Sequence, residues 1–307
     1  MKKHTAHTPI YTQNNGGLNI QTGFTSEFTQ QDSTSYLTIK QHGLDLLDQY
    51  QRNGLLVNSK SYLKKLVEDA SVLSDAWLCN DLSQVPMTHL FSMLQLERIA
   101  TAALPLGVSV QAKKYLGELL DGSLDLLSRS NSKAKNTLWE LELWQLLIKL
   151  GMHATLEEPD IVVSFDGARI GVACKKIYSE KNISKVLSNA VSQFENTFDF
   201  GIVAFNLDDL IPAHNILKTT TIEEMAKKIS DHNFSFLNRH EQYLRRYLSP
   251  GRAISAFIST SVIAEVATAE PRFLNSRQST IWNIPGLTQA KEKQILNFFN
   301  ALNAAHT

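Results

Sequence analysis

Cysteine, an excess of either charge and long apolar runs are all scarce in this 307-residue sequence. The two cysteines, Cys79 and Cys174, lie far apart without C-x-x-C spacing, which excludes a disulfide framework and is typical of a reducing, cytoplasmic compartment. There are 30 basic and 30 acidic residues, so any nucleic-acid site has to be a local patch. No apolar run approaches the roughly 20 residues that span a bilayer, and no Gly-rich phosphate loop occurs, so we expect neither a membrane protein nor an ATPase.

The chain divides by composition and periodicity into three regions. Residues 1–35 are rich in Thr, Gln, Asn, Ser and Gly, which predicts a flexible polar arm. Residues 36–130 have helical spacing of apolar residues, which predicts four or five helices in a regulatory, specificity or assembly domain. A polar break at residues 128–136 marks the start of the last region, 131–307.

The last region alternates between helical and strand-like periods. A strongly amphipathic helix is expected over 136–151, followed by two strands, a helix, a strand, one or two helices, a long β-branched strand near 252–267 and a C-terminal helix. This order predicts the α/β class, with a mixed β-sheet flanked by helices.

Two apolar runs joined by Asp166-Gly167 predict a β-hairpin with a two-residue turn. Counting outward from the turn pairs Phe165 with Ala168 and, at the far end, Asp160 with Ala173. Because side chains alternate between faces, Asp160, Ala173 and Lys175 are expected together on one face. Cys174 is expected on the opposite, apolar face, where it packs.

This arrangement would suit a divalent cation if position 173 carried an acid. Opposed residues have Cβ atoms about 4.5–5.5 Å apart, so two carboxylates there would share Mg²⁺ or Mn²⁺. The carbonyl of Cys174 would be a further ligand. Lys175 would orient water or stabilise a phosphate charge.

The order "WELELWQLLIKLG", "PDIVV", "GVACKK" and "SKVLSNAVSQFE" resembles the PD-(D/E)xK nuclease superfamily, which has the restriction-endonuclease-like fold. The resemblance implies a metal-dependent DNA endonuclease that uses Mg²⁺ or Mn²⁺. The site residues that it implies are Glu140 (or Glu142) on the helix, Asp160, position 173, Lys175 and Gln193, with Asp160, position 173, Glu140 and the Cys174 carbonyl at the metal.

The same resemblance implies a setting and partners. These are restriction or anti-phage defence, a DNA or alternatively an RNA substrate, a partner ATPase or helicase, and a homodimer.

The departure from the family pattern is Ala173, where Glu or Asp is expected. An engineered replacement of the catalytic acid is the favoured interpretation because the rest of the motif is intact. The alternatives are a natural member that has lost catalysis, or a member in which another acid such as Glu140 or Glu180 fills the role. In the first two cases the chain cleaves little or nothing.

Simpler interpretations stand beside these. Asp160 can be a turn residue, Glu140 a residue that stabilises the start of its helix, and Gln193 a surface residue. The lysines near the motif, and the arginines of "RHEQYLRRYLSPGR", can bind phosphates or be ordinary solvated side chains. The alternative functions are a non-catalytic nucleic-acid-binding or scaffold protein on this fold, and a helical interaction module gripped by a partner at residues 36–129. The lysines near the motif that were named above as possible phosphate-binding residues are Lys133, Lys135, Lys175, Lys176, Lys181 and Lys185.

Overall fold

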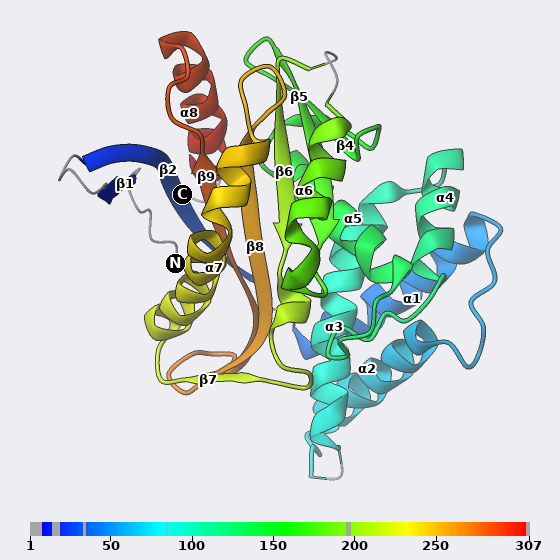
Figure 1. Cartoon of the computed structure of the whole chain (residues 1–307). Coiled ribbons are helices and arrows are strands. Elements are labelled where there is room, and N and C mark those ends of the chain that lie inside the picture. The colour runs from blue at the N-terminus through cyan, green and yellow to red at the C-terminus, as the bar shows by residue number, and fades with distance from the viewer. Residues whose placement is uncertain (1–7, 14–18, 33–34, 84, 195–197, 305–307) are drawn as a thin grey trace.

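A nine-stranded mixed sheet with helices on both faces forms the body of the molecule (Figure 1). The computed structural model describes residues 8–13, 19–32, 35–83, 85–194 and 198–304. The expected α/β class, a mixed sheet flanked by helices, is therefore confirmed. Within the described ranges, no helix combines the length and the apolar character needed to cross a bilayer.

The strands run in the order β1-β2-β9-β8-β6-β5-β4-β3, and β7 also pairs with β8. Strands β5, β6, β7 and β8 pair in parallel, and the remaining pairs are antiparallel. The long β-branched run forms β8 near the centre of the sheet, as predicted. The strands are β1 (Thr8–Gln13), β2 (Asn19–Asp32), β3 (His153–Thr155), β4 (Ile161–Phe165), β5 (Ala168–Lys176), β6 (Phe200–Asn206), β7 (Leu217–Thr219), β8 (Ala253–Val266) and β9 (Phe273–Asn283).

Within the described residues, five α-helices lie between β2 and the central strands, and three more join or follow those strands. Serine and threonine N-caps at Ser35, Ser61, Ser109 and Thr221 accept a backbone N–H and fix the start of four helices. The helices are α1 (Tyr36–Arg52), α2 (Tyr62–Leu78), α3 (Met87–Ala103), α4 (Val110–Leu119), α5 (Lys133–Lys149), α6 (Ile183–Ser192), α7 (Ile222–Tyr247) and α8 (Gln289–Ala304), with short 3-10 turns at Leu104–Leu106, Glu180–Asn182 and Asp208–Leu210.

The two faces of the sheet are covered by different helices (Figure 1). Phe205 of β6 contacts Phe236 of α7, so α7, together with α6, covers the face that carries Ala173 and Lys175. On the other face, Trp139 of α5 stacks on Phe257 of β8. One continuous apolar cluster joins α1–α4 to the sheet and its helices. The helical region therefore packs directly on the sheet.

The polar arm expected at the N-terminus is instead, where it is described, a pair of strands. Residues 24–32 of β2 pair with residues 275–283 of β9, and β1 pairs with β2. The expectation was wrong here because it relied on composition, and polar residues with strand alternation can still complete a sheet whose edge is otherwise unpaired. Residues 1–7, 14–18 and 33–34 of the expected arm lie outside the described residues.

Candidate functional site

The hairpin that carries the motif has the predicted register. Ile161 pairs with Val172, and Phe165 pairs with Ala168 across the turn. Asp166 and Gly167 both have positive φ angles, 49° and 74°, as a type I′ turn requires. The turn therefore fixes which side chains of β4 and β5 share a face.

Asp160 and Lys175 meet at the far end of this hairpin. The Asp160 Oδ2 atom accepts a hydrogen bond from the Lys175 ammonium at 3.1 Å and another from the backbone N–H of Cys174 at 2.7 Å. Both side chains are about four-fifths buried, at 19% and 22% exposure. Burial raises the pKa of Asp160, although Lys175 and the Cys174 N–H act in the other direction.

The two adjacent lysines of β5 have separate environments. Lys175 lies on the face of Asp160, whereas the Lys176 ammonium lies 2.7 Å from Asp209 and donates to Asn206 at 2.5 Å on the opposite face. Lys176 is therefore occupied in the interior, and Lys175 is the only one of this pair that reaches Asp160.

Ala173 is fully buried beside this ion pair, on the face that α6 and α7 cover. Two glycines on the same face let an aromatic ring lie flat against the strands: an added Cβ at Gly201 would lie 2.7 Å from Phe194, and one at Gly171 would lie 2.9 Å from Phe198. The close packing of Phe194 against Gly201 brings the adjacent Gln193 towards the Asp160–Lys175 pair.

Gln193 contacts the segment that leads into Asp160. Its side-chain amide donates to the carbonyl of Pro159 at 3.2 Å. The Gln193 Oε1 atom is buried and has no hydrogen-bond partner in the described part of the chain. Gln193 is thus placed to position the Pro159–Asp160 backbone, and its free oxygen can accept one more hydrogen bond.

The choice between Glu140 and Glu142 of α5 is decided by their partners. Glu142 is bound by Arg98 (2.8 and 3.1 Å) and by Arg277 (2.5 Å). Glu140 makes no hydrogen bond or ion pair with any described residue. Burial, followed by the charge of Asp160, raises the pKa of Glu140 to about 8, while Lys175 acts in the opposite direction. Glu140 is therefore the α5 acid that belongs with Asp160.

Cys174 and Glu180 have roles in packing and pairing. Cys174 is buried, and desolvation raises the pKa of its thiol, so the sulfur is a protonated packing group as expected. Glu180 accepts two hydrogen bonds from Arg239 (2.9 and 2.7 Å) and lies 2.6 Å from the His240 ring. The suggestion that Glu180 fills the place of the missing acid is wrong, because these partners hold its carboxylate between the 3-10 turn and α7.

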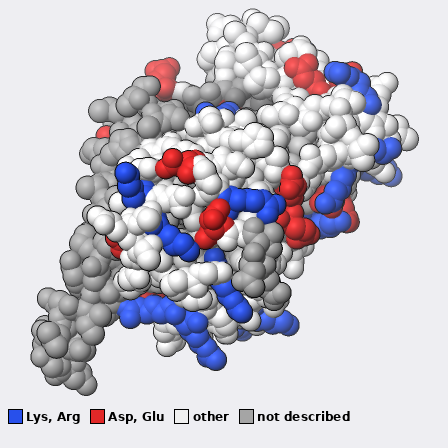
Figure 2. Space-filling model, turned by 90° about the horizontal axis from the view of Figure 1, so that it is seen from above, with Lys and Arg blue, Asp and Glu red and all other residues white. Residues whose placement is uncertain are grey.

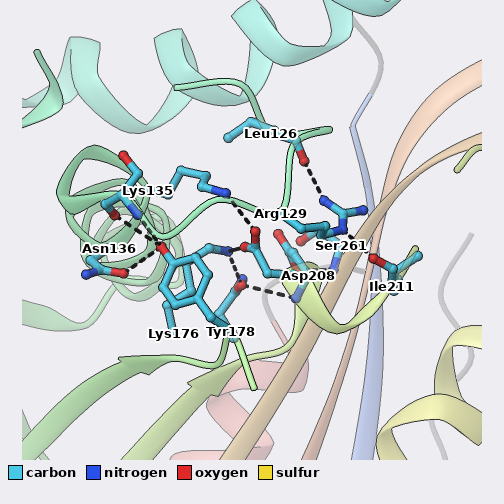
Figure 3. A network of polar contacts seen from close by, with 12 residues as sticks. Leu126, Arg129, Lys135, Asn136, Lys176, Tyr178, Asp208, Ile211 and Ser261 are labelled. Atoms are coloured by element: carbon cyan, nitrogen blue, oxygen red, sulfur yellow. Dashed lines mark hydrogen bonds and ion pairs between the residues drawn. The ribbon is translucent and has the colours of Figure 1, made fainter. Parts of the chain in front are cut away.

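Figure 3 shows a polar network around Lys135, Lys176 and Asp208. Since side chains alternate along β5, Lys176 and this network lie on the face opposite to Lys175. Asp209 receives the ammonium groups of Lys135 (2.6 Å) and Lys176 (2.7 Å), and Asp208 pairs with Arg98 at 2.9 Å. Burial alone would raise the pKa of Asp208, but the charges of Arg98 and Lys176 outweigh it and hold this pKa below the ordinary value. Lys135 and Lys176 are therefore structural, and the suggestion that they bind phosphates is wrong.

Exposed basic residues in the 3-10 turn before α6, on α6 and on α7 are only partly neutralised. Figure 2 shows Lys and Arg side chains at the lower edge and across the middle of the face seen from above, with Asp and Glu side chains beside several of them. Arg245 pairs with Glu241, whereas Lys181 and Lys185 are exposed and have no acidic partner within the described ranges. The positive charge is local, as the zero net charge requires.

The donor set fits a divalent cation only in part. Asp160 and Glu140 are two acids close enough for their charges to interact, and hard cations favour carboxylate oxygens as ligands. Ala173 supplies no oxygen. No group of three or more His, Cys, Asp or Glu side chains suited to a metal occurs among the residues that the structure describes. The described residues therefore give an incomplete ligand set, and Ala173 lies on the face that α6 and α7 cover, opposite to the face on which α5 packs.

Two features of this neighbourhood were not anticipated from the sequence. Lys114 and Tyr115 of α4 lie close enough to Glu140 for their charges to interact. The Asp208-Asp209 pair binds the cationic side chains of the interior network. In the sequence, this pair is recognisable as two adjacent acids shortly after the end of a parallel strand.

Comparison of this chain with protein-family profiles, with curated proteins and with solved structures finds no match.

Proposed function

We propose that this chain has the scaffold of a metal-dependent DNA endonuclease of the PD-(D/E)xK type, with one metal-binding carboxylate missing at Ala173. One observation carries the proposal. The Asp160 carboxylate and the Lys175 ammonium lie 3.1 Å apart at the end of a hairpin whose register was predicted by counting from the Asp166-Gly167 turn. The nearby Glu140, which no described residue pairs, supports the same assignment.

The role of each residue is taken from the family resemblance and is compared with its contacts. Asp160 and Glu140 would hold Mg²⁺ or Mn²⁺, with the Cys174 carbonyl as a further oxygen. The bound metal would lower the pKa of a water and neutralise charge on the scissile phosphate. The metal would neutralise the Asp160 carboxylate in place of Lys175. The Lys175 ammonium would then be free to interact with the scissile phosphate or with the attacking water. Gln193 would hold the backbone that carries Asp160.

The chain as written is expected to bind metal weakly and to cleave little or nothing. Ala173→Glu is the variant that tests this, assayed for cleavage of plasmid DNA and of a structured RNA with Mg²⁺, with Mn²⁺ and with EDTA. We expect nicking that depends on the metal. Ala173→Asp is a second variant with a shorter side chain, in case Glu does not fit a site that is fully buried.

Two controls make the result specific. Ala173→Gln has the size of Glu without its charge, and A173E/D160N removes the acid that the proposal makes essential. Neither control is expected to cleave. If the folded Glu and Asp variants leave every substrate intact, and their melting temperatures do not rise when Mn²⁺ is added, the nuclease assignment is wrong.

A non-catalytic nucleic-acid-binding or scaffold protein on the same fold is the second candidate. The observation in its favour is that Lys175 already neutralises Asp160, so the Ala173 form satisfies both groups without metal. This candidate predicts DNA or RNA binding by the Ala173 chain that is unchanged by Mg²⁺ and by the residue at position 173.

The biological setting is proposed from the family resemblance alone. It comprises restriction or anti-phage defence in the cytoplasm, a partner ATPase or helicase, and a homodimer.

A further inference from the structure

Helix α4 of the helical region connects the two segments that carry the site's acids. Its Gln111 side-chain amide donates to the carbonyl of Leu156, in the short segment before Asp160, at 2.7 Å. At its other end, Glu118 accepts a hydrogen bond from Thr137, which lies one turn before Glu140 on α5, at 3.2 Å. The side chains between these two anchors, Lys114 and Tyr115, are therefore held next to the site.

Lys114 and Tyr115 present groups that suit a phosphate. Lys114 is exposed, with its ammonium 5.0 Å from the centre of the Tyr115 ring. The ring of Tyr115 is buried, and its hydroxyl makes no hydrogen bond with a described residue. The charge of Lys114 opposes the rise in the pKa of Glu140, and burial followed by the charge of Glu140 raises the pKa of Tyr115. Both residues are thus within electrostatic reach of the acids.

A nucleic-acid strand at this site needs such a cation. The Asp160 carboxylate repels a phosphate backbone, and Lys175, which would offset this repulsion, is already paired with Asp160. Glu140, whose pKa is raised to about 8, is mostly protonated at neutral pH and adds no positive charge. A further positive group beside the acids would hold the strand in register, and a neutral tyrosine hydroxyl would add a hydrogen bond to a phosphate oxygen.

We propose that Lys114 and Tyr115 bind a phosphate group of the nucleic acid, adjacent to the phosphate held at Asp160 and Lys175. This inference rests on the proposed function. It places α4 beside the bound strand, so that the helical region contacts the nucleic acid directly.

Binding of fluorescently labelled duplex DNA to the Ala173 chain tests the inference without requiring cleavage. Anisotropy titrations are run in EDTA over a range of KCl concentrations for the unsubstituted chain, Lys114→Ala, Tyr115→Phe and Lys113→Ala. Lys113 is the matched control: it is the preceding exposed lysine of α4, but its ammonium lies beside Gly54, 3.6 Å from where a Cβ on that glycine would be.

Lys114→Ala is expected to weaken binding about three- to ten-fold and to lower the slope of log K against log[KCl] by about one, since one phosphate contact is lost. Tyr115→Phe is expected to weaken binding about two- to three-fold with the slope unchanged, because a neutral hydrogen bond is lost. Lys113→Ala should leave both quantities as they are. A purely structural role for Lys114 would not change the salt slope.

The outcomes separate this inference from the proposed function. Suppose that Lys114→Ala and Lys113→Ala bind DNA with the same affinity and the same slope of log K against log[KCl], while A173E cleaves DNA. In that case α4 does not contact the nucleic acid, and the nuclease assignment stands. If the unsubstituted chain binds neither duplex nor single strands at low salt, and A173E cleaves nothing, both are overturned.

Discussion

Glu140→Gln should stabilise the metal-free protein at alkaline pH. The substitution keeps the shape of the side chain and removes its ability to ionise. In the folded chain, burial and the neighbouring Asp160 charge raise the pKa of Glu140 from 4.5 to about 8. The folded state therefore keeps a proton that the unfolded chain releases near its ordinary pKa.

The sign and size of the effect follow from this difference. Below about pH 4.5 both states hold the proton, so Glu140 contributes nothing. As the pH rises from there to about 8, only the unfolded state loses the proton, and the free energy of unfolding falls. At about 1.4 kcal/mol per pH unit, the interval from 4.5 to 8 sets an upper limit of about 5 kcal/mol. Glu140 is only part-buried and water can reach it, so we expect about 2 kcal/mol.

Urea unfolding in EDTA at about pH 5 and about pH 8.5 measures the effect. The free energy of unfolding of the Gln variant minus that of the parent should be near zero at the lower pH and about 2 kcal/mol at the higher one. Glu157→Gln, at an exposed position before β4, controls for the loss of one carboxylate. An equal difference at both pH values, or a less stable Gln variant at the higher pH, would refute the assignment of Glu140 to a desolvated, acid-lined site.

Two further perturbations test other parts of the structure. Asp209→Asn should lower the free energy of unfolding by about 3–5 kcal/mol, because it leaves the two buried ammonium groups without their carboxylate; chemical denaturation measures it, and a loss below about 1 kcal/mol would contradict the buried network. Removal of residues 1–33 should expose the edge of β9 and cause concentration-dependent association, measured by light scattering; a truncated chain that stays monomeric and equally stable would show that β2 contributes little.

The hairpin was predictable because local rules determine it. Asp-Gly between two alternating runs selects the turn, the turn selects the register, and the register selects the faces of Asp160 and Lys175. Helical spacing likewise predicted α1–α5, and the β-branched run predicted β8. In each case the signal lies within about 20 neighbouring residues and does not depend on the rest of the chain.

Features that depend on distant partners could not be predicted in this way. The run Asn275–Thr280 of β9 is entirely polar yet buried, because β2, β8 and helices on both faces enclose it. No alternation of apolar residues marks this run as a strand. The approach of α4 to Glu140 depends on two side-chain contacts between segments that are far apart in the sequence. The partners that separate Glu142 from Glu140 are also remote, Arg98 lying on α3 and Arg277 on β9.

The interior network and position 173 lie on opposite faces of the sheet. The charges that anchor the end of β5 lie on one face, and Ala173 lies on the other. On the proposed function, a single substitution at 173 would therefore remove hydrolysis and leave these anchoring charges in place. Such a form would compete with an active copy for the same ligand, and would act as an inhibitor through occupancy alone.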